Sequence, residues 1–227
     1  MYRLLASLLC FRVSHAELAG DISVTSDYLA YGITQTNHQA ALQISGAYAH
    51  ASGLHASLWT SNVELDGEEG YEVDLAAGYG RELGDVSLDV GMVRYLYYGS
   101  QALKAGEFNE MFLGLVFHEY TALNFAYSNN GSGAGARHLT TELTHDIPLA
   151  GYDVLLGLAD VRSFDADKLS WDNDGNYQYW QLALAKQRKR LYAEVSLQGN
   201  NLETKADPEL KKLADPRVVL LLSFLLQ

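Results

Sequence analysis

Carboxylate side chains recur at alternate positions in stretches of the chain that are otherwise apolar. In residues 71–79 the odd positions hold Tyr, Val, Leu, Ala and Tyr, and the even positions include Glu72 and Asp74. Residues 86–92 repeat this pattern, with Asp89 among the polar positions. Successive side chains of a β-strand point to opposite faces, so each strand would have one apolar and one acidic face. Because a dry core does not accept unpaired carboxylates, the acidic face is expected to meet water.

A ring of such carboxylates around a water-filled channel would concentrate cations and repel anions. The alternative is that the carboxylates pair with Arg or Tyr side chains across a narrow, closed lumen and only hold its shape. No cofactor is implied by either interpretation. The candidate lining residues are Glu72, Asp74, Asp89, Glu110, Glu142 and Glu194, with Arg94 as a basic partner.

The alternation of apolar and polar residues extends over twelve segments, which is typical of an antiparallel transmembrane β-barrel of the outer membrane. A soluble barrel of the lipocalin kind would instead turn its apolar face inward. Short periplasmic turns are predicted to alternate strictly with longer extracellular loops, such as residues 98–108, 129–137, 163–176 and 200–216. The predicted strands are residues 22–31, 41–50, 54–61, 71–80, 86–97, 109–117, 122–128, 138–147, 152–162, 177–186, 191–199 and 217–226.

Apolar and aromatic residues indicate where lipid would contact this all-β barrel. The last predicted strand places Val218, Leu220, Leu222 and Phe224 on one face, as expected for a surface in contact with lipid. Aromatic residues gather near predicted strand ends, where interfacial girdles are expected. These aromatics are Tyr95, Tyr97, Tyr98, Trp171, Tyr177, Tyr179 and Trp180.

Residues 1–16 have the composition of a secretory signal peptide, with a basic start, an apolar run and a small-x-small site that ends at Ala16. Residues 17–227 are then expected to form one barrel domain in the outer membrane of a Gram-negative bacterium. Cleavage leaves 14 basic against 28 acidic side chains, a net charge of −14, which opposes binding to nucleic acid. The single cysteine, Cys10, lies in the leader, so the mature chain has no thiol chemistry.

One acidic loop is dense enough in hard oxygen ligands to raise the question of a Ca²⁺ site. Its spacing does not match an EF-hand, so the favoured interpretation is a solvated loop without metal. Acidic outer loops could also be bridged by divalent cations to lipopolysaccharide, a partner expected alongside the lipids of the outer membrane. The weak Ca²⁺ candidates are Asp165, Asp167, Asp172 and Asp174.

Short motifs recur along the mature chain, and together they resemble one family. They comprise Ser26, Asp27, Tyr28, Gly32, Trp59, Asn62, Gly78, Gly91 and Tyr95. This set resembles the bacterial TorF family of porins, a conserved-hypothetical outer-membrane family of the Gcw_chp type, and the resemblance implies an outer-membrane barrel of unspecified solute. The chain departs from the family at Tyr31, where Arg is common. It also ends in Gln227, where outer-membrane barrels usually carry an aromatic residue that the barrel-assembly machinery reads.

Three functions are compatible with these features. The first is a porin for passive diffusion of small hydrophilic solutes, with a preference for cations. The second is a closed structural barrel, or a surface-interaction barrel that acts through its extracellular loops. The third is an outer-membrane lipid hydrolase, because such barrels can carry Ser and His in a catalytic set. The chain has no Gly-x-Ser-x-Gly motif, and no enzymatic activity is predicted.

Overall fold

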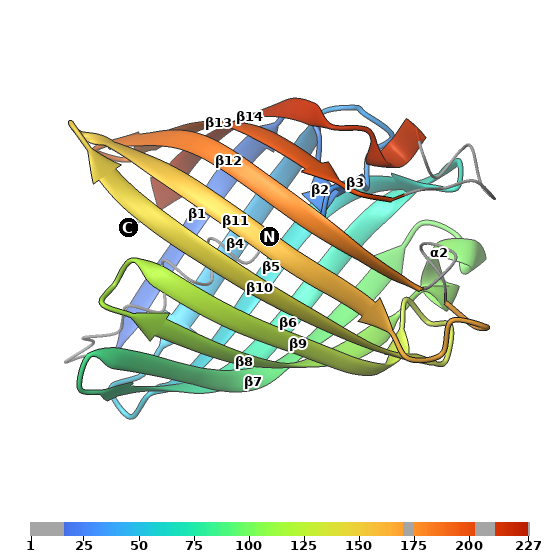
Figure 1. The fold of residues 1–227 in the computed structure, drawn as a ribbon, viewed down its shortest axis with the longest axis horizontal. Helices are drawn as coiled ribbons and strands as arrows, with labels where there is room; N and C mark the ends of the chain where they lie inside the picture. The colour runs from blue at the N-terminus through green and yellow to red at the C-terminus, as the bar shows by residue number, and fades with distance from the viewer. Residues whose placement is uncertain (1–15, 170–174, 203–211, 227) are drawn as a thin grey trace.

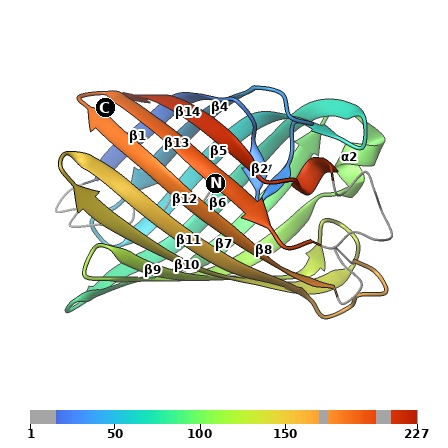
Figure 2. The same cartoon turned by 45° about the horizontal axis from the view of Figure 1, so that its top comes forward.

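The chain folds into a closed antiparallel β-barrel of twelve strands (Figures 1 and 2). The computed structural model describes residues 16–169, 175–202 and 212–226. The ring closes between the first and last strands, where Gly20 lies opposite Leu226, so the predicted fold class is confirmed. The barrel strands are β1 (Glu17–Thr25), β4 (Ala41–Ala49), β5 (Leu54–Leu65), β6 (Glu68–Leu83), β7 (Val86–Tyr98), β8 (Phe108–Phe117), β9 (Thr121–Gly131), β10 (Ala136–Leu149), β11 (Tyr152–Ser163), β12 (Asn176–Arg188), β13 (Leu191–Asn200) and β14 (Arg217–Leu226).

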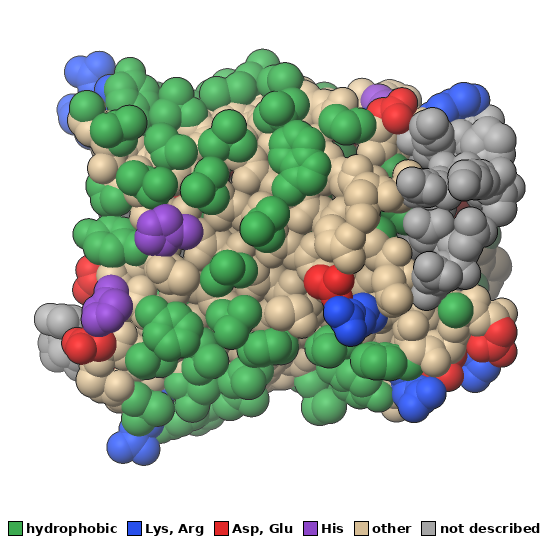
Figure 3. Space-filling view, viewed as in Figure 1, with side chains coloured by type: hydrophobic (Ala, Val, Ile, Leu, Met, Phe, Trp, Pro, Cys, Tyr) green, Lys and Arg blue, Asp and Glu red, His purple; other side chains and the backbone are tan. Residues whose placement is uncertain are grey.

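Apolar side chains cover the outside of the wall, as the period of two predicts. In β14, Val218, Leu220 and Leu222 are 56–64% exposed, whereas the alternate residues Val219 and Ser223 are 5% and 3% exposed. Figure 3 shows hydrophobic side chains spread over the wall, with Lys and Arg mostly at the two ends of the barrel. This exposed apolar band suits contact with lipid tails. No helix in the described part of the chain has the length and hydropathy to cross a membrane.

The connections differ at the two ends of the barrel, which we call the turn end and the loop end. At the turn end, tight turns follow β4, β6, β8, β10 and β12. At the loop end, a helix, α2 (Gln101–Ala105), lies between β7 and β8, and longer segments follow β11 and β13. The predicted strict alternation is wrong at β5–β6, because pairing continues to Leu65 opposite Glu68 and leaves a two-residue turn. The predicted loop 129–137 shrinks to residues 132–135 for the same reason.

The first predicted strand, residues 22–31, is wrong at its C-terminal half. Strand β1 ends at Thr25. At the next residue, the side-chain hydroxyl of Ser26 takes the place of a backbone acceptor in the pairing with β14. The Ser26 amide donates to Leu220 O at 2.9 Å, and the Leu220 amide donates to Ser26 Oγ at 3.0 Å. The chain then leaves the wall, and residues 26–40, which we call the inner segment, contribute side chains to the lining of the lumen.

Candidate functional site: the lumen and its inner segment

The inner segment is built around a small hairpin inside the loop end of the barrel (Figure 2). Strands β2 (Leu29–Ala30) and β3 (Ile33–Thr34) pair, and Tyr31 and Gly32 form the turn with φ of 49° and 78°. Two successive positive φ values define a type I′ turn, which favours Gly. A Cβ at Gly32 would also lie 2.8 Å from the Tyr179 ring, so the hairpin tip packs closely on β12.

The inner segment bridges opposite sides of the barrel. On one side, Tyr28 packs edge-on against Trp59 of β5 with ring centroids 5.1 Å apart. On the other side, Tyr31 and Ile33 pack against a buried cluster that includes Val161 of β11. Strands β5 and β11 are six positions apart in the twelve-stranded ring. The segment therefore crosses the lumen and narrows it.

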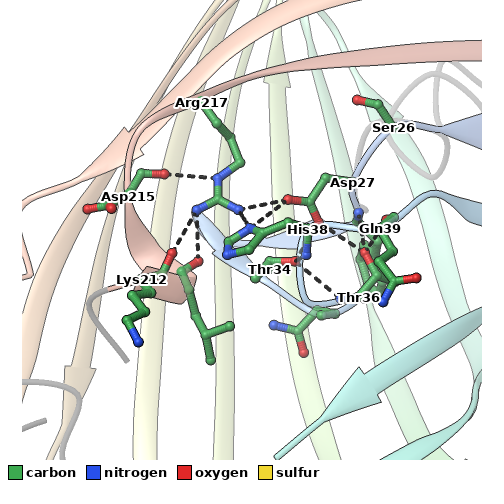
Figure 4. Close-up of polar contacts among 12 residues, drawn as sticks. Ser26, Asp27, Thr34, Thr36, His38, Gln39, Lys212, Asp215 and Arg217 are labelled. Atoms are coloured by element: carbon green, nitrogen blue, oxygen red, sulfur yellow. Dashed lines mark hydrogen bonds and ion pairs between the residues drawn. The ribbon is translucent and has the colours of Figure 1, made fainter. Parts of the chain in front are cut away.

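Asp27 holds the inner segment to the last strand of the barrel (Figure 4). Its carboxylate accepts hydrogen bonds from the Thr34 hydroxyl and, at 3.0 Å, from the Thr36 hydroxyl. Arg217 Nη1 of β14 donates to Asp27 Oδ2 at 2.8 Å and also contacts the His38 ring. The Arg217 side chain is 15% exposed and that of Asp27 is 6% exposed, so the pair is shielded from solvent. A shielded pair of this kind is weakened little by salt.

Substitution Arg217→Ala is expected to loosen the inner segment without opening the wall. Removing one partner of a buried ion pair costs about 3 kcal/mol, because the other charge is left uncompensated. Hydrogen exchange of the refolded protein in detergent should therefore rise at the amide of Gln35, which bonds Tyr28 O at 2.7 Å. The matched control is Arg162→Ala, since Arg162 pairs with Asp160 at 58% side-chain exposure. Equal exchange in both variants and the wild type would contradict the role of Arg217.

The lumen is a cavity of about 1380 Å³ that residues from both ends of the barrel line. In β10, for example, Thr140, Glu142, Thr144 and Asp146 all line it, as expected for alternate positions of one strand. No Lys or Arg among the described residues belongs to the lining. The acidic lining residues are Glu17, Asp21, Asp27, Glu64, Asp66, Glu72, Glu110, Glu119, Glu142, Asp146, Asp153 and Glu194.

Four of the predicted lining residues, Glu72, Glu110, Glu142 and Glu194, lie in the cavity lining. Asp74 and Asp89 are on the inner face of their strands but buried in the wall, at 5% exposure each.

Most of these carboxylates have partners inside the barrel. Asp89 Oδ1 lies 2.8 Å from His55 Nε2, and Glu110 Oε2 lies 3.0 Å from His138 Nε2. Glu194 accepts a hydrogen bond of 2.6 Å from the Tyr192 hydroxyl. The Tyr97 hydroxyl donates to Glu72 Oε1 at 3.2 Å. Each histidine pair joins two strands that have one strand between them in the ring, and sequence alone did not indicate these pairs.

The prediction that Arg94 lines the lumen is corrected by its position. Arg94 shares the outward face of β7 with Val90 and Met92, which are 46% and 52% exposed. Its Nη2 donates to Glu107 Oε2 at 2.7 Å, just before β8. The inward positions beside it are Val93 and Tyr95, at 2% and 5% exposure. Arg94 therefore ties β7 to the segment before β8 instead of balancing the acidic lumen.

Four of the aromatics predicted for the interfacial girdles, Tyr95, Tyr97, Tyr177 and Tyr179, point inward instead. Tyr95, Tyr177 and Tyr179 are 2–6% exposed and line the cavity, whereas Tyr98 is 53% exposed on the outside. Tyr179 receives the tip of the inner segment, with its ring 6.5 Å from that of Tyr31. These rings pack the inner wall, and the inner segment depends on that packing. Trp171 lies outside the described residues.

The weak Ca²⁺ candidates are not brought together in the described part of the chain. Both carboxylate oxygens of Asp165 accept hydrogen bonds from the Arg137 guanidinium, at 2.9 Å each. This guanidinium holds the pKa of Asp165 well below its usual range. Asp167 is exposed, and Asp172 and Asp174 lie outside the described residues. Among the described residues, no group of three or more His, Cys, Asp or Glu side chains is arranged to hold a metal ion.

The remaining motif residues fix the inner segment or the wall beside it. Asn62 of β5 accepts from the Leu42 amide at 2.8 Å and donates to Ala40 O at 3.3 Å, where the segment rejoins the wall. Gly78 and Gly91 allow close approach, since an added Cβ would lie 2.7 Å from the His55 ring and 2.4 Å from Ala77 O, respectively. Together with Asp27, Tyr28, Gly32, Trp59 and Tyr95, these residues give the motifs a shared structural basis.

The closed barrel, its apolar outer band and its polar lumen define a porin-like protein, and this fold indicates an outer-membrane location. A family model described as "Bacterial protein of unknown function (Gcw_chp)" matches residues 12–220, so the chain belongs to this family. A search of curated protein sequences finds no match.

Two porins of known structure share the fold. The NanC porin superposes with a TM-score of 0.60 at 12% identity, over 92% of this chain and 99% of that one. The KdgM porin gives a TM-score of 0.55 at 10% identity, over 91% and 98% of the respective chains. At such identities the likeness is one of fold alone.

Proposed function

We propose that the protein is an outer-membrane channel for passive diffusion of small hydrophilic solutes, and that it favours cations. The observation that carries the proposal is the composition of the lumen, in which twelve acidic residues and, among the described residues, no Lys or Arg form the lining. Charge of one sign in a confined pore raises the local concentration of the opposite ion. We also propose that the chain is a TorF porin, that it comes from a Gram-negative bacterium and that residues 1–16 are removed.

The orientation follows from the two ends of the barrel. The tight turns would face the periplasm. The longer connections, including the start of the inner segment, would face the outside of the cell. Lipopolysaccharide and other outer-membrane lipids would surround the apolar band, and the barrel-assembly machinery would insert the chain. We infer no covalent chemistry and no cofactor.

The proposed solute class differs from the ligand in one structure of a porin with a similar fold. One KdgM structure is a complex with disordered oligogalacturonate, which is a polyanion. An acidic lumen without lysine or arginine in its described lining repels such a chain. The likeness of fold therefore does not carry that solute over to this protein, and small cations or neutral solutes fit better.

A second candidate, a barrel closed to solutes, is favoured by the inner segment that crosses the lumen. Recordings of the refolded protein in a planar bilayer under a salt gradient separate the two. Reproducible current steps with a cation-favouring reversal potential are expected for the channel. An anion-favouring potential would contradict the proposed selectivity. Silence from protein whose folding is shown by heat-modifiable migration in gels would favour the closed barrel.

A further inference from the structure

Two neighbouring carboxylates on the inner face of β6 differ from the others in the lumen. Glu72 and Asp74 are 2% and 5% exposed. Three of their oxygen atoms, Glu72 Oε2 and both carboxylate oxygens of Asp74, are buried without a hydrogen-bond partner. By contrast, Asp89 and Glu110 each lie within 3.0 Å of a histidine nitrogen. The pair on β6 therefore lacks a counter-charge of its own.

This arrangement is costly for the protein alone. Residues two apart on a strand share a face, so Glu72 and Asp74 repel one another if both are ionised. A buried carboxylate without a partner also pays for its desolvation. No Lys or Arg belongs to the described lining of the lumen, and Arg94 points outward. A cation from outside the chain would offset both costs, as would protonation of one of the two carboxyl groups.

Aromatic rings surround the two carboxylates. Across the neighbouring strands, Asp74 lies opposite Trp59 of β5 and Tyr95 of β7, and Glu72 lies opposite Tyr97 of β7. The inner segment adds Tyr28, packed edge-on against Trp59. Glu72 and all four rings line the cavity, so this cluster borders the path through the lumen.

The chemistry of this cluster selects among cations. Ca²⁺ and Mg²⁺ require six or more oxygen ligands in defined geometry, and Zn²⁺ requires three or four protein ligands. Among the described residues, no group of three or more His, Cys, Asp or Glu side chains is arranged to hold a metal ion. An alkylammonium or guanidinium group instead needs one or two carboxylates and gains from the faces of aromatic rings. Two carboxylates among four aromatic rings match that requirement.

We propose that Glu72 and Asp74, with Trp59, Tyr95 and Tyr97 around them and Tyr28 beside them, form a subsite for the ammonium or guanidinium group of an organic cation that passes through the lumen. The subsite lies where the inner segment narrows the lumen. A bound cation would contact Glu72 at the cavity wall, with the buried carboxylate of Asp74 two residues further along β6. The inference rests on the proposed channel function and names its solute class.

The test uses n-butylammonium chloride as the probe and Trp59 as the reporter. Substitutions Trp171→Phe and Trp180→Phe leave Trp59 as the single tryptophan, since the chain has three. We expect a saturable change of Trp59 fluorescence on titration of the folded protein in detergent. The double substitution Glu72→Gln with Asp74→Asn should weaken binding at least about tenfold, which corresponds to about 1.4 kcal/mol. The charge-matched control, Glu142→Gln with Glu194→Gln, should bind as the parent does.

Thermal unfolding gives a second readout that does not depend on fluorescence. The probe should raise the Tm of the parent protein and leave that of the Glu72→Gln, Asp74→Asn variant unchanged. If that double variant fails to fold, Glu72→Gln alone serves, with Glu142→Gln as its control. Equal binding of the probe by parent and variant would overturn the subsite, and so would the absence of binding to the parent.

Bilayer recordings separate this inference from the proposed function. In the parent, n-butylammonium should reduce the sodium current in a saturable manner, and this block should be lost in the β6 variant. A cation-selective channel that shows neither block nor binding would remove the subsite and leave the channel function standing. A silent or anion-selective protein that still binds the probe at Trp59 would remove the cation-channel function and leave the binding site standing.

Discussion

Replacing the hairpin of the inner segment with a short Gly-Ser linker is expected to raise the single-channel conductance about two- to threefold, because conductance scales with the open cross-section of a water-filled pore. The replaced residues, 28–35, cross the lumen between β5 and β11. They contribute no strand to the barrel ring, so the wall should remain closed. Single-channel recordings in a planar bilayer give the measurement.

The control for this variant must keep the barrel and disturb a different loop. An equivalent Gly-Ser replacement of residues 164–168, none of which lines the cavity, should leave conductance at the wild-type value. Heat-modifiable migration in gels would show that both variants are folded. Unchanged conductance after removal of the hairpin would mean that the narrowest part of the lumen lies elsewhere. A conductance that appears only after the removal would identify the inner segment as a complete closure.

Introducing lysine into the column of lumen residues on β10, by Glu142→Lys with Asp146→Lys, is expected to lower the ratio of potassium to chloride permeability severalfold. Both carboxylates line the cavity and face it from alternate positions of one strand. Reversing two charges alters the potential of a pore far more than that of an exposed surface, where solvent and salt screen it. The reversal potential under a tenfold salt gradient gives the ratio.

The charge-matched control for the β10 variant is Asp167→Lys with Glu68→Lys, because both residues are exposed near the loop end and lie outside the lining. Its reversal potential should stay within experimental error of that of the wild type. An equal effect of both double substitutions would assign selectivity to the general surface charge of the protein. No effect of the β10 substitutions would remove these two carboxylates from the ion path.

The wall of the barrel could be predicted because lipid imposes a period of two on every strand. That periodicity places the outward-facing apolar residues of the last strand correctly, as Val218 and Leu220 show. It also indicates the true side of two residues that were predicted from their chemical type. Arg94 shares its parity with the outward residues Val90 and Met92, and Tyr179 has the opposite parity to the outward residue Leu182. Parity is therefore a better guide to the side of a residue than its chemical type.

The inner segment could not be predicted in the same way. Its main ionic contact joins Asp27 to Arg217, which are 190 positions apart, and its tip rests on Tyr179. No local pattern reports contacts over such separations. The sequence shows the motif residues from Ser26 to Gly32, but their role as an internal bridge follows only from the three-dimensional arrangement. The same is true of the partner that each lumen carboxylate finds.

The pairing of Asp27 with Arg217 also bears on the order of events during biogenesis. Asp27 follows the first strand, whereas its partner begins the last strand, and Asn200, which donates to Gly32 O at 2.9 Å, ends the strand before it. The inner segment can therefore reach its final position only after the C-terminal strands have been added. The contacts that fix the constriction to β13 and β14 therefore form late, although the inner segment is among the first residues to be synthesised.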